Sequence, residues 1–265
     1  MDRSSGITDP AQDLARGPNG VPLLDLHVHV EEGLSLERAL QLARERGVRF
    51  GVVEHGGHGQ PIADDEALTR YVESLQAHPV FKGIQAEGLD WMECFTEQGI
   101  AKLDFVLSDA LTLPEKDGRR VRIWQPQVTV DDKQDWMERY VDFNVQVISS
   151  EPIDILGNPT FLPDRIVGEY DALWTPRRMR RVIEAALKHS VAIEINARYR
   201  IPSATFIRMA KEAGVRFSFG SNEHGEKVGI LDHCLAMTTE CALTPQDIFV
   251  PVPSRRRRPF PKPDR

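Results

Sequence analysis

The stretch VPLLDLHVH at residues 21–29 places an apolar run directly before the pattern Asp25-Leu26-His27-Val28-His29. Successive side chains of a β-strand alternate between its two faces, so His27 and His29 would lie on the same side. Two neutral imidazoles presented together are good ligands for zinc, manganese or iron. Such a pair alone is only moderately specific, because two unrelated polar residues at a strand end give the same pattern. The rest of the chain has to decide between a metal site and a structural role.

Apolar runs of strand length recur along the chain and alternate with amphipathic segments. Most runs are continuous, as in strands that are covered on both faces. Helix signals separate them: Ser35 and Gly47 bracket one segment, Thr175-Pro176 begins another, and Ser203 begins a third. These alternations favour an α/β barrel over an open doubly wound sheet, since no Gly-x-Gly-x-x-Gly follows the first strand. The expected strands are residues 21–28, 49–54, 80–87, 103–108, 153–157, 191–196 and 215–220.

Side chains able to bind metal ions follow nearly every expected strand. The C-terminal ends of barrel strands share one face, and α/β barrels place their chemistry there. Polar residues with purely structural roles would not track the strand ends so regularly, so the pattern favours a metal site. These residues are Glu54, His55, Glu87, Asp109, Asn158, Glu194, Asn196, Asn222 and His224.

The order and spacing of these segments resemble the PHP family, named for polymerase and histidinol phosphatase. The resemblance covers about residues 22–240 and implies a distorted seven-stranded (β/α)7 barrel of the PHP type. DLHVH followed by VEH is similar to the family's opening, and GIQAEGLD to its Gly-x-Glu segment. The later matches are DFVLSDAL to the strand before Ser-x-His, DILGNP to the strand before His-Pro, VAIEINARY to Glu-Ile-Asn, and AGVRFSFGSNEH to the closing Ser-Asp-Ala-His.

The resemblance implies a cluster of divalent metal ions held by His, Asp and Glu. Three family ligands are replaced here, by Ala110 in Ser-x-His, Asn158 in His-Pro and Asn222 in the closing motif. An asparagine offers a carbonyl oxygen but neither charge nor imidazole, so one or two zinc, manganese or iron ions are expected rather than three. Asp109 and His58 are further candidates for the lost positions, although the strand alternation would turn Asp109 away from the side of Ala110. The candidate metal ligands are His27, His29, His55, Glu87, Asn158, Asn222 and His224.

Charge divides the chain into an acidic body and a basic tail. Residues 251–265 hold six Lys or Arg and one Asp, a net +5, which leaves −12 for residues 1–250. We expect a flexible arm over 1–20, one barrel domain over 21–250 and a disordered Pro-rich tail over 251–265. The acidic body disfavours nucleic acid except through the tail. Without a signal peptide, a membrane-spanning run or a Cys-x-x-Cys pair, a reducing cytoplasm is expected.

The resemblance implies a metal-dependent hydrolase acting on the phosphate ester of a small molecule. Arg198 and Arg200 follow the sixth strand and could bind the phosphate. Residues 112–135 form an insertion in which Asp117-Gly118 predicts a hairpin, and its arginines and Trp124 could cover the site. A PHP-fold protein that binds a ligand without catalysis is the main alternative. An amidohydrolase is a weaker one, because the late aspartate of that superfamily would fall on Asn222.

Overall fold

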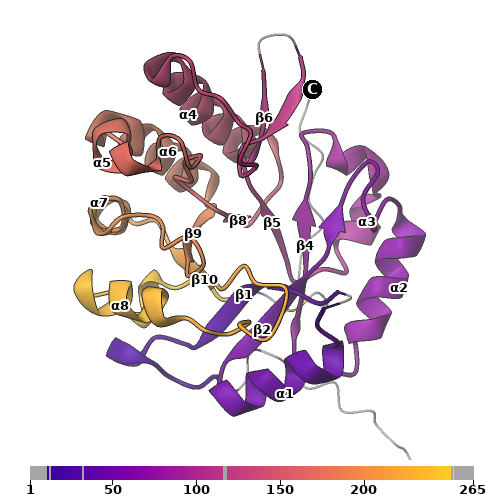
Figure 1. The fold of residues 1–265 in the computed structure, drawn as a ribbon. Helices are drawn as coiled ribbons and strands as arrows, with labels where there is room; N and C mark the ends of the chain where they lie inside the picture. Colours follow the sequence, from indigo (N-terminus) through magenta and orange to yellow (C-terminus); the bar gives the residue numbers. More distant parts are fainter. Residues whose placement is uncertain (1–10, 12, 32, 116–117, 252, 254–265) are drawn as a thin grey trace, which may run out of the picture.

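The structure, a computed structural model, describes residues 11, 13–31, 33–115, 118–251 and 253. In this part of the chain seven parallel strands form a nearly closed barrel in the order β1-β2-β4-β5-β8-β9-β10, with helices arranged around them (Figure 1). Strand order follows chain order, which confirms the α/β barrel expected from the sequence. The strands are β1 (Leu24–His29), β2 (Arg49–Val53), β4 (Phe81–Ala86), β5 (Phe105–Ser108), β8 (Ile155–Leu156), β9 (Ala192–Asn196) and β10 (Phe217–Gly220).

The segment that follows β10 completes the barrel against β1. The Asn222 amide donates to the carbonyl of His27 at 3.0 Å, and the His29 amide donates to the carbonyl of Glu223 at 3.3 Å. The first and last parts of the predicted site, far apart in sequence, therefore lie side by side.

Local capping signals fix the ends of the outer helices. The hydroxyls of Ser35, Thr175 and Ser203 each accept a backbone N–H in the first turn of a helix, and Gly47 and Gly214 end two helices in the left-handed conformation. The helices are α1 (Leu36–Arg46), α2 (Asp65–Leu75), α3 (Glu97–Ile100), α4 (Lys133–Ser150), α5 (Tyr170–Leu173), α6 (Pro176–His189), α7 (Ala204–Ala213) and α8 (Asp232–Glu240), with 3-10 turns η1 (Pro18–Gly20), η2 (Trp91–Cys94), η3 (Val167–Glu169) and η4 (Pro245–Asp247).

Two shorter strand elements lie outside the main order. β3 (His55–Gly56) pairs with β4, and β6 (Thr112–Pro114) pairs with β7 (Arg120–Arg122) in an antiparallel hairpin. This is the hairpin predicted within 112–135. Part of its turn, residues 116–117, and most of the predicted tail lie outside the described residues. Residue Asn19, within the expected arm, donates to the carbonyls of Thr238 and Leu243 beside α8.

Large side chains fill the interior of the barrel toward the N-terminal ends of its strands. Leu24, Leu26, Phe81 and Phe105 belong to an interior cluster separate from the larger core between the strands and the helices. Phe105 fits because Gly83 on the neighbouring strand has no side chain: a Cβ there would lie 2.3 Å from the Phe105 ring. The filled interior leaves the C-terminal ends of the strands as the place for a site.

An irregularity in β1 directs its two histidines. The pairing of β1 with β2 gains one residue on β1 between Asp25 and Val28, which is a β-bulge. Leu26 faces the interior cluster, whereas His27 and His29 contact side chains near the C-terminal ends of the barrel strands. The bulge thus divides one strand into a packing half and a polar half.

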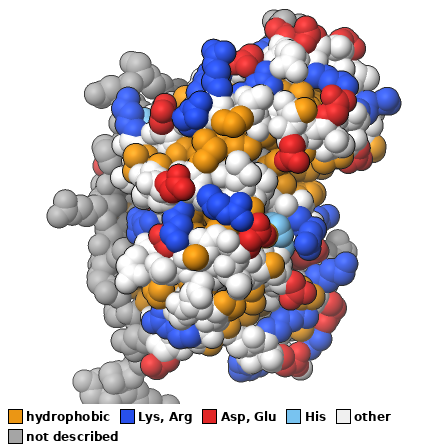
Figure 2. Space-filling model, turned by 90° about the vertical axis from the view of Figure 1, so that its left-hand side faces the viewer, with side chains coloured by type: hydrophobic (Ala, Val, Ile, Leu, Met, Phe, Trp, Pro, Cys, Tyr) orange, Lys and Arg blue, Asp and Glu red, His pale blue; other side chains and the backbone are white. Residues whose placement is uncertain are grey.

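Acidic and basic side chains are interspersed on the outer face over α5 to α8, with small apolar patches between them (Figure 2). No helix of the described residues is long and apolar enough to span a membrane.

We predict that His233 on α8 makes the fold sensitive to acid. It is 7 % exposed, both ring nitrogens lack a hydrogen-bond partner in the described residues, and burial together with Arg200 lowers the pKa of its imidazole, against a smaller effect of Glu240. The unfolded chain therefore binds a proton below about pH 6.5 that the folded chain resists, so the free energy of unfolding falls as the pH drops. This loss reaches at most about 2 kcal/mol by pH 5.

The test is denaturant unfolding of the wild type and of His233→Leu at pH 7 and pH 5. The variant should lose less stability than the wild type between the two pH values. An equal loss in both proteins would show that other groups cause the acid sensitivity.

Candidate active site at the C-terminal ends of the strands

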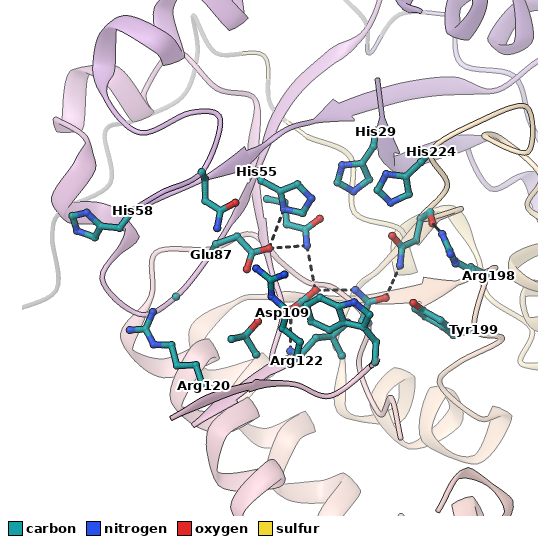
Figure 3. A pocket seen from close by; sticks show the side chains of 18 of the residues that line it. His29, His55, His58, Glu87, Asp109, Arg120, Arg122, Arg198, Tyr199 and His224 are labelled. Carbon is teal, nitrogen blue, oxygen red and sulfur yellow. Dashed lines mark hydrogen bonds and ion pairs between the residues drawn. The ribbon is translucent and has the colours of Figure 1, made fainter. Parts of the chain in front are cut away.

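A cavity of about 580 Å³ opens at the C-terminal ends of the strands. Of the seven predicted metal ligands, six line it: His29, His55, Glu87, Asn158, Asn222 and His224. Among the described residues it also receives polar side chains that the sequence reasoning did not assign to the site or treated as secondary: His58, Gln60, Gln85, Asp90, Asp109, Thr112, Arg120, Arg122, Arg198 and Tyr199 (Figure 3).

Three imidazoles lie next to one another on one wall. The ring of His29 stacks on His224 at 4.3 Å between centroids and on His55 at 4.9 Å. The Nδ1–H of His55 donates to Glu87 at 3.0 Å and that of His224 donates to Glu31 at 2.7 Å, which leaves each Nε2 as the unprotonated nitrogen when the ring is neutral. Burial and the neighbouring imidazoles of His27, His224 and His55 lower the pKa of His29 well below its ordinary value, so this ring is neutral.

Two carboxylates face each other across the amide of Gln85. The Gln85 Nε2 lies 3.3 Å from both Glu87 Oε1 and Asp109 Oδ2 (Figure 3). Burial, followed by the charge of Glu87, raises the pKa of Asp109 to about 6. A raised pKa indicates that the negative charge here lacks sufficient positive compensation.

His27 lies beneath the cavity rather than on its wall. Its Nδ1–H donates to Glu194 at 2.7 Å, and its Nε2 lies 3.0 Å from the Gln85 Oε1. Because the Gln85 Nε2 donates to two carboxylates, its oxygen has to accept, so both nitrogens of His27 carry hydrogen. Burial opposes that charge, but Glu194 outweighs it and raises the pKa of His27 above its ordinary value. As arranged, His27 has no ring nitrogen left for a metal ion.

Gly220 makes room for this buried pair. A Cβ at that position would lie 2.0 Å from Glu194 Oε1 and 2.8 Å from the His27 Cβ. The second oxygen of Glu194 accepts the backbone N–H of Asn158 at 2.7 Å and the side chain of Asn196 at 3.0 Å. The pair is therefore fully hydrogen-bonded inside the barrel.

Three asparagines form a connected amide network. The Asn158 Oδ1 accepts from Asn196 at 3.0 Å and from Asn222 at 2.8 Å, and its Nδ2 donates to Asp109 at 2.9 Å. Asn158 and Asn222 have φ values of 47° and 50°, in the left-handed region that asparagine tolerates better than most residues. Backbone conformation and side-chain bonding both account for asparagine at these positions.

Only one of the two arginines expected to bind phosphate lines the cavity. Arg198 does, and its guanidinium donates to the carbonyl of Asn222 at 3.1 Å. Arg200, two residues on, is exposed and does not belong to the lining. The chain reverses here through the bridge between Asn196 and Ile201.

Two site residues could have been found more accurately from the sequence. Counted from Gly83, the Gly-x-Glu pattern falls on Gln85, and Glu87 lies two residues later. Asp109 was expected to point the opposite way from Ala110, and it does: Phe105 and Leu107 belong to the barrel interior and Asp109 lines the cavity, whereas Val106 and Ala110 belong to the outer core. The site lies on the side of Asp109, not on the side of Ala110.

The cavity contains side chains of the types that bind a divalent cation, but their positions do not bring their ligand atoms to one point. Among the described residues no group of three or more His, Cys, Asp or Glu is placed to hold a metal ion. The His29 and His224 planes are only 4° apart, so their in-plane lone pairs run side by side and do not meet at one point. Yet imidazoles whose Nδ1–H donates to a carboxylate, beside an uncompensated acid, are the donor set of zinc-type ions.

The fold and the cavity together define an α/β-barrel protein with a polar site rich in histidine and acids. No protein-family model matches the chain. No curated protein matches it either. Among solved structures, a histidinol phosphate phosphatase from Lactococcus lactis subsp. lactis, in complex with zinc, L-histidinol and phosphate, has a TM-score of 0.61 and 16% identity over 86% of this chain and 98% of that chain. An HpcH/HpaI aldolase from Desulfitobacterium hafniense has a TM-score of 0.35 and 14% identity over 74% of this chain and 86% of that chain, too low to show a common fold.

Proposed function

We propose that this protein is a metal-dependent hydrolase of a small phosphate ester. The observation that carries the proposal is one cavity that the adjacent imidazoles of His29, His55 and His224 and the acids Glu87 and Asp109 share with cationic side chains, including Arg122 and Arg198. The likeness to the Lactococcus phosphatase, whose structure holds zinc and phosphate, supports it at the level of fold. A divalent ion supplies two things to this reaction when bound: it withdraws charge from the phosphoryl oxygens and lowers the pKa of water.

The chain's own residues have separate roles in this proposal. His29, His55 and His224 bind the cation, one or two ions in total, with Glu87 and Asp109 contributing charge. Glu31 and Glu87 orient the imidazoles of His224 and His55 through their Nδ1–H groups. Arg198 binds the phosphate through its guanidinium, whose position the Asn222 carbonyl fixes. His27 supports the site from below through Gln85.

A second candidate, a PHP-fold protein that binds its ligand without catalysis, is favoured by the amide network. The Gln85 amide donates to Glu87 and Asp109. Asn158 also donates to Asp109 and accepts from Asn222, so side-chain amides already hydrogen-bond the two acids. The two candidates differ in metal content and in turnover.

We predict that the protein binds zinc or manganese and hydrolyses 4-nitrophenyl phosphate only when the metal is present. Replacing His224 by alanine should remove bound metal, and Glu31→Gln should weaken metal binding by about 10- to 100-fold, as loss of a carboxylate behind a metal-bound histidine does. Metal content by elemental analysis, affinity by calorimetry and release of 4-nitrophenol are the three measurements.

Glu45→Gln on α1 is the matched control, since it removes an exposed carboxylate outside the cavity. Its metal affinity should equal that of the wild type. Metal-free protein that gains no turnover with either ion, yet binds inorganic phosphate, would reject the hydrolase and favour the binding protein.

A further inference from the structure

Two arginine–aromatic pairs line the cavity, each on a different element. The guanidinium of Arg122 lies over the ring of Trp124 at 5.8 Å, and that of Arg198 lies over the ring of Tyr199 at 5.7 Å. A guanidinium that rests on an aromatic ring is held in place by it while its N–H groups stay free for an anion. The cavity therefore contains two oriented positions for negative charge.

Strand alternation places the first pair. Along β7 and the residues after it, Arg120, Arg122 and Trp124 are exposed, whereas Val121 is half-buried and Ile123 is buried. Exposed side chains two residues apart share a face, and all three line the cavity. The Ile123 amide donates to the Leu111 carbonyl at 2.8 Å, which joins the base of the hairpin to the end of β5. The pair is thus held on an anchored hairpin.

The loop after β9 places the second pair. The ring of Tyr199 packs edge-on against Phe161 at 4.8 Å, and its backbone N–H donates to Asn196 Oδ1 at 2.9 Å. The Arg198 guanidinium donates to the Asn222 carbonyl as described above. These contacts fix the ring and the guanidinium without neutralising the charge.

No nearby carboxylate balances the positive charge of Arg122 or fully balances that of Arg198 in the described residues. Arg120 lies 3.5 Å from Asp90, and so is compensated. Within the described residues Arg122 forms no ion pair, and the acid nearest to Arg198 is Glu223 at 3.9 Å, at the limit of an ion pair. Glu87 and Asp109 belong to the histidine end, where a bound cation would take up their charge.

We propose that the two pairs bind two separate anionic groups of one substrate. The substrate class is a small phosphate ester that carries a second anionic group, and a cationic amine next to the phosphate is disfavoured. This specificity rests on the proposed function, because the hydrolysed phosphate is the group that reaches the histidine end. Arg198, closer to that end through Asn222, takes the phosphate, and Arg122 takes the second anion (Figure 3).

Three probes of similar size test the proposal: phosphoglycolate, ethyl phosphate and phosphoethanolamine, whose second group is negative, neutral and positive. Calorimetry on the full chain should give phosphoglycolate an affinity at least about 10-fold above that of ethyl phosphate, with phosphoethanolamine weakest, since one charge-assisted contact is worth that factor or more. Arg122→Gln should reduce the preference for phosphoglycolate over ethyl phosphate to less than about 3-fold. The affinity of this variant for ethyl phosphate should stay within about 3-fold of the wild-type affinity. Arg177→Gln, an exposed arginine of α6 outside the cavity, should change neither value.

Release of inorganic phosphate, followed in parallel with added manganese, separates this inference from the proposed function. The ranking of affinities without any release supports the two-anion pocket and rejects the hydrolase. Release from all three probes at equal kcat/KM, with equal affinities, supports the hydrolase and overturns the pocket. A preference for phosphoglycolate that survives Arg122→Gln also overturns the assignment.

Discussion

Replacing His27 by alanine is expected to lower the free energy of unfolding by about 3–5 kcal/mol, because it leaves a buried carboxylate without its partner. The side chains of Glu194 and His27 are each 1 % exposed, and Glu194 Oε1 fills the space next to Gly220, where a Cβ would lie 2.0 Å from it. Had His27 been a metal ligand on the cavity wall, the same change would remove metal and leave the fold almost unaffected. The structure therefore predicts a stability effect where the sequence pattern predicts a binding effect.

The matched control is His29→Ala, two residues along the same strand and on the cavity wall. His29→Ala should lower the free energy of unfolding by about 1 kcal/mol, as an average substitution does. His27→Ala should have a larger effect and lower the melting temperature by about 10 °C. The double variant His27→Ala with Glu194→Gln should recover part of the loss, since the unpaired charge is removed. Equal melting temperatures for the two single variants would contradict the buried pair.

The framework of the barrel could be predicted because its signals are local. Ser35, Thr175 and Ser203 act as helix caps within three residues of themselves, and continuous apolar runs mark the strands that lie between them. The convergence of His29, His55 and His224 also followed, because the C-terminal ends of parallel strands meet on one face whatever the details of packing.

The assignment of single side chains could not be predicted, because it depends on contacts between distant segments. Whether Arg198 or Arg200 reaches the cavity is decided by the reversal between Asn196 and Ile201, and by a hydrogen bond to Asn222. His27 and His29 have the same pattern in the sequence, and only Glu194, from a strand far along the chain, makes the first a buried partner and leaves the second at the wall.

The strongest test of a cation at the histidine end is to place a charge between the two acids. We predict that Gln85→Glu raises the affinity for zinc or manganese by at least about 10-fold, since a carboxylate next to Glu87 and Asp109 adds a full negative charge where the amide supplies a dipole. The same variant without metal should lose about 1–3 kcal/mol of stability, because the Nε2 contacts at 3.3 Å to both acids become contacts between like charges. This loss should grow as the pH rises through the range in which Asp109 ionises, which the added carboxylate moves above the wild-type pKa of about 6.

Gln60→Glu is the control, since Gln60 lines the same cavity but has no hydrogen bond to either acid in the described residues. It should change metal affinity by less than about 3-fold. Adding Asn222→Asp to Gln85→Glu should raise the affinity for the metal ion further. Asn158→Asp adds a negative charge on the other side of Asp109, and aspartate, like asparagine, tolerates the left-handed backbone at this position. Calorimetric titration with each ion gives the metal affinity, and thermal unfolding with and without a chelator gives the stability of the protein with and without metal. If Gln85→Glu destabilises the metal-free protein without gaining affinity, the acids at this end belong to the hydrogen-bond network alone, and the cation of the proposed hydrolase has to bind elsewhere in the cavity.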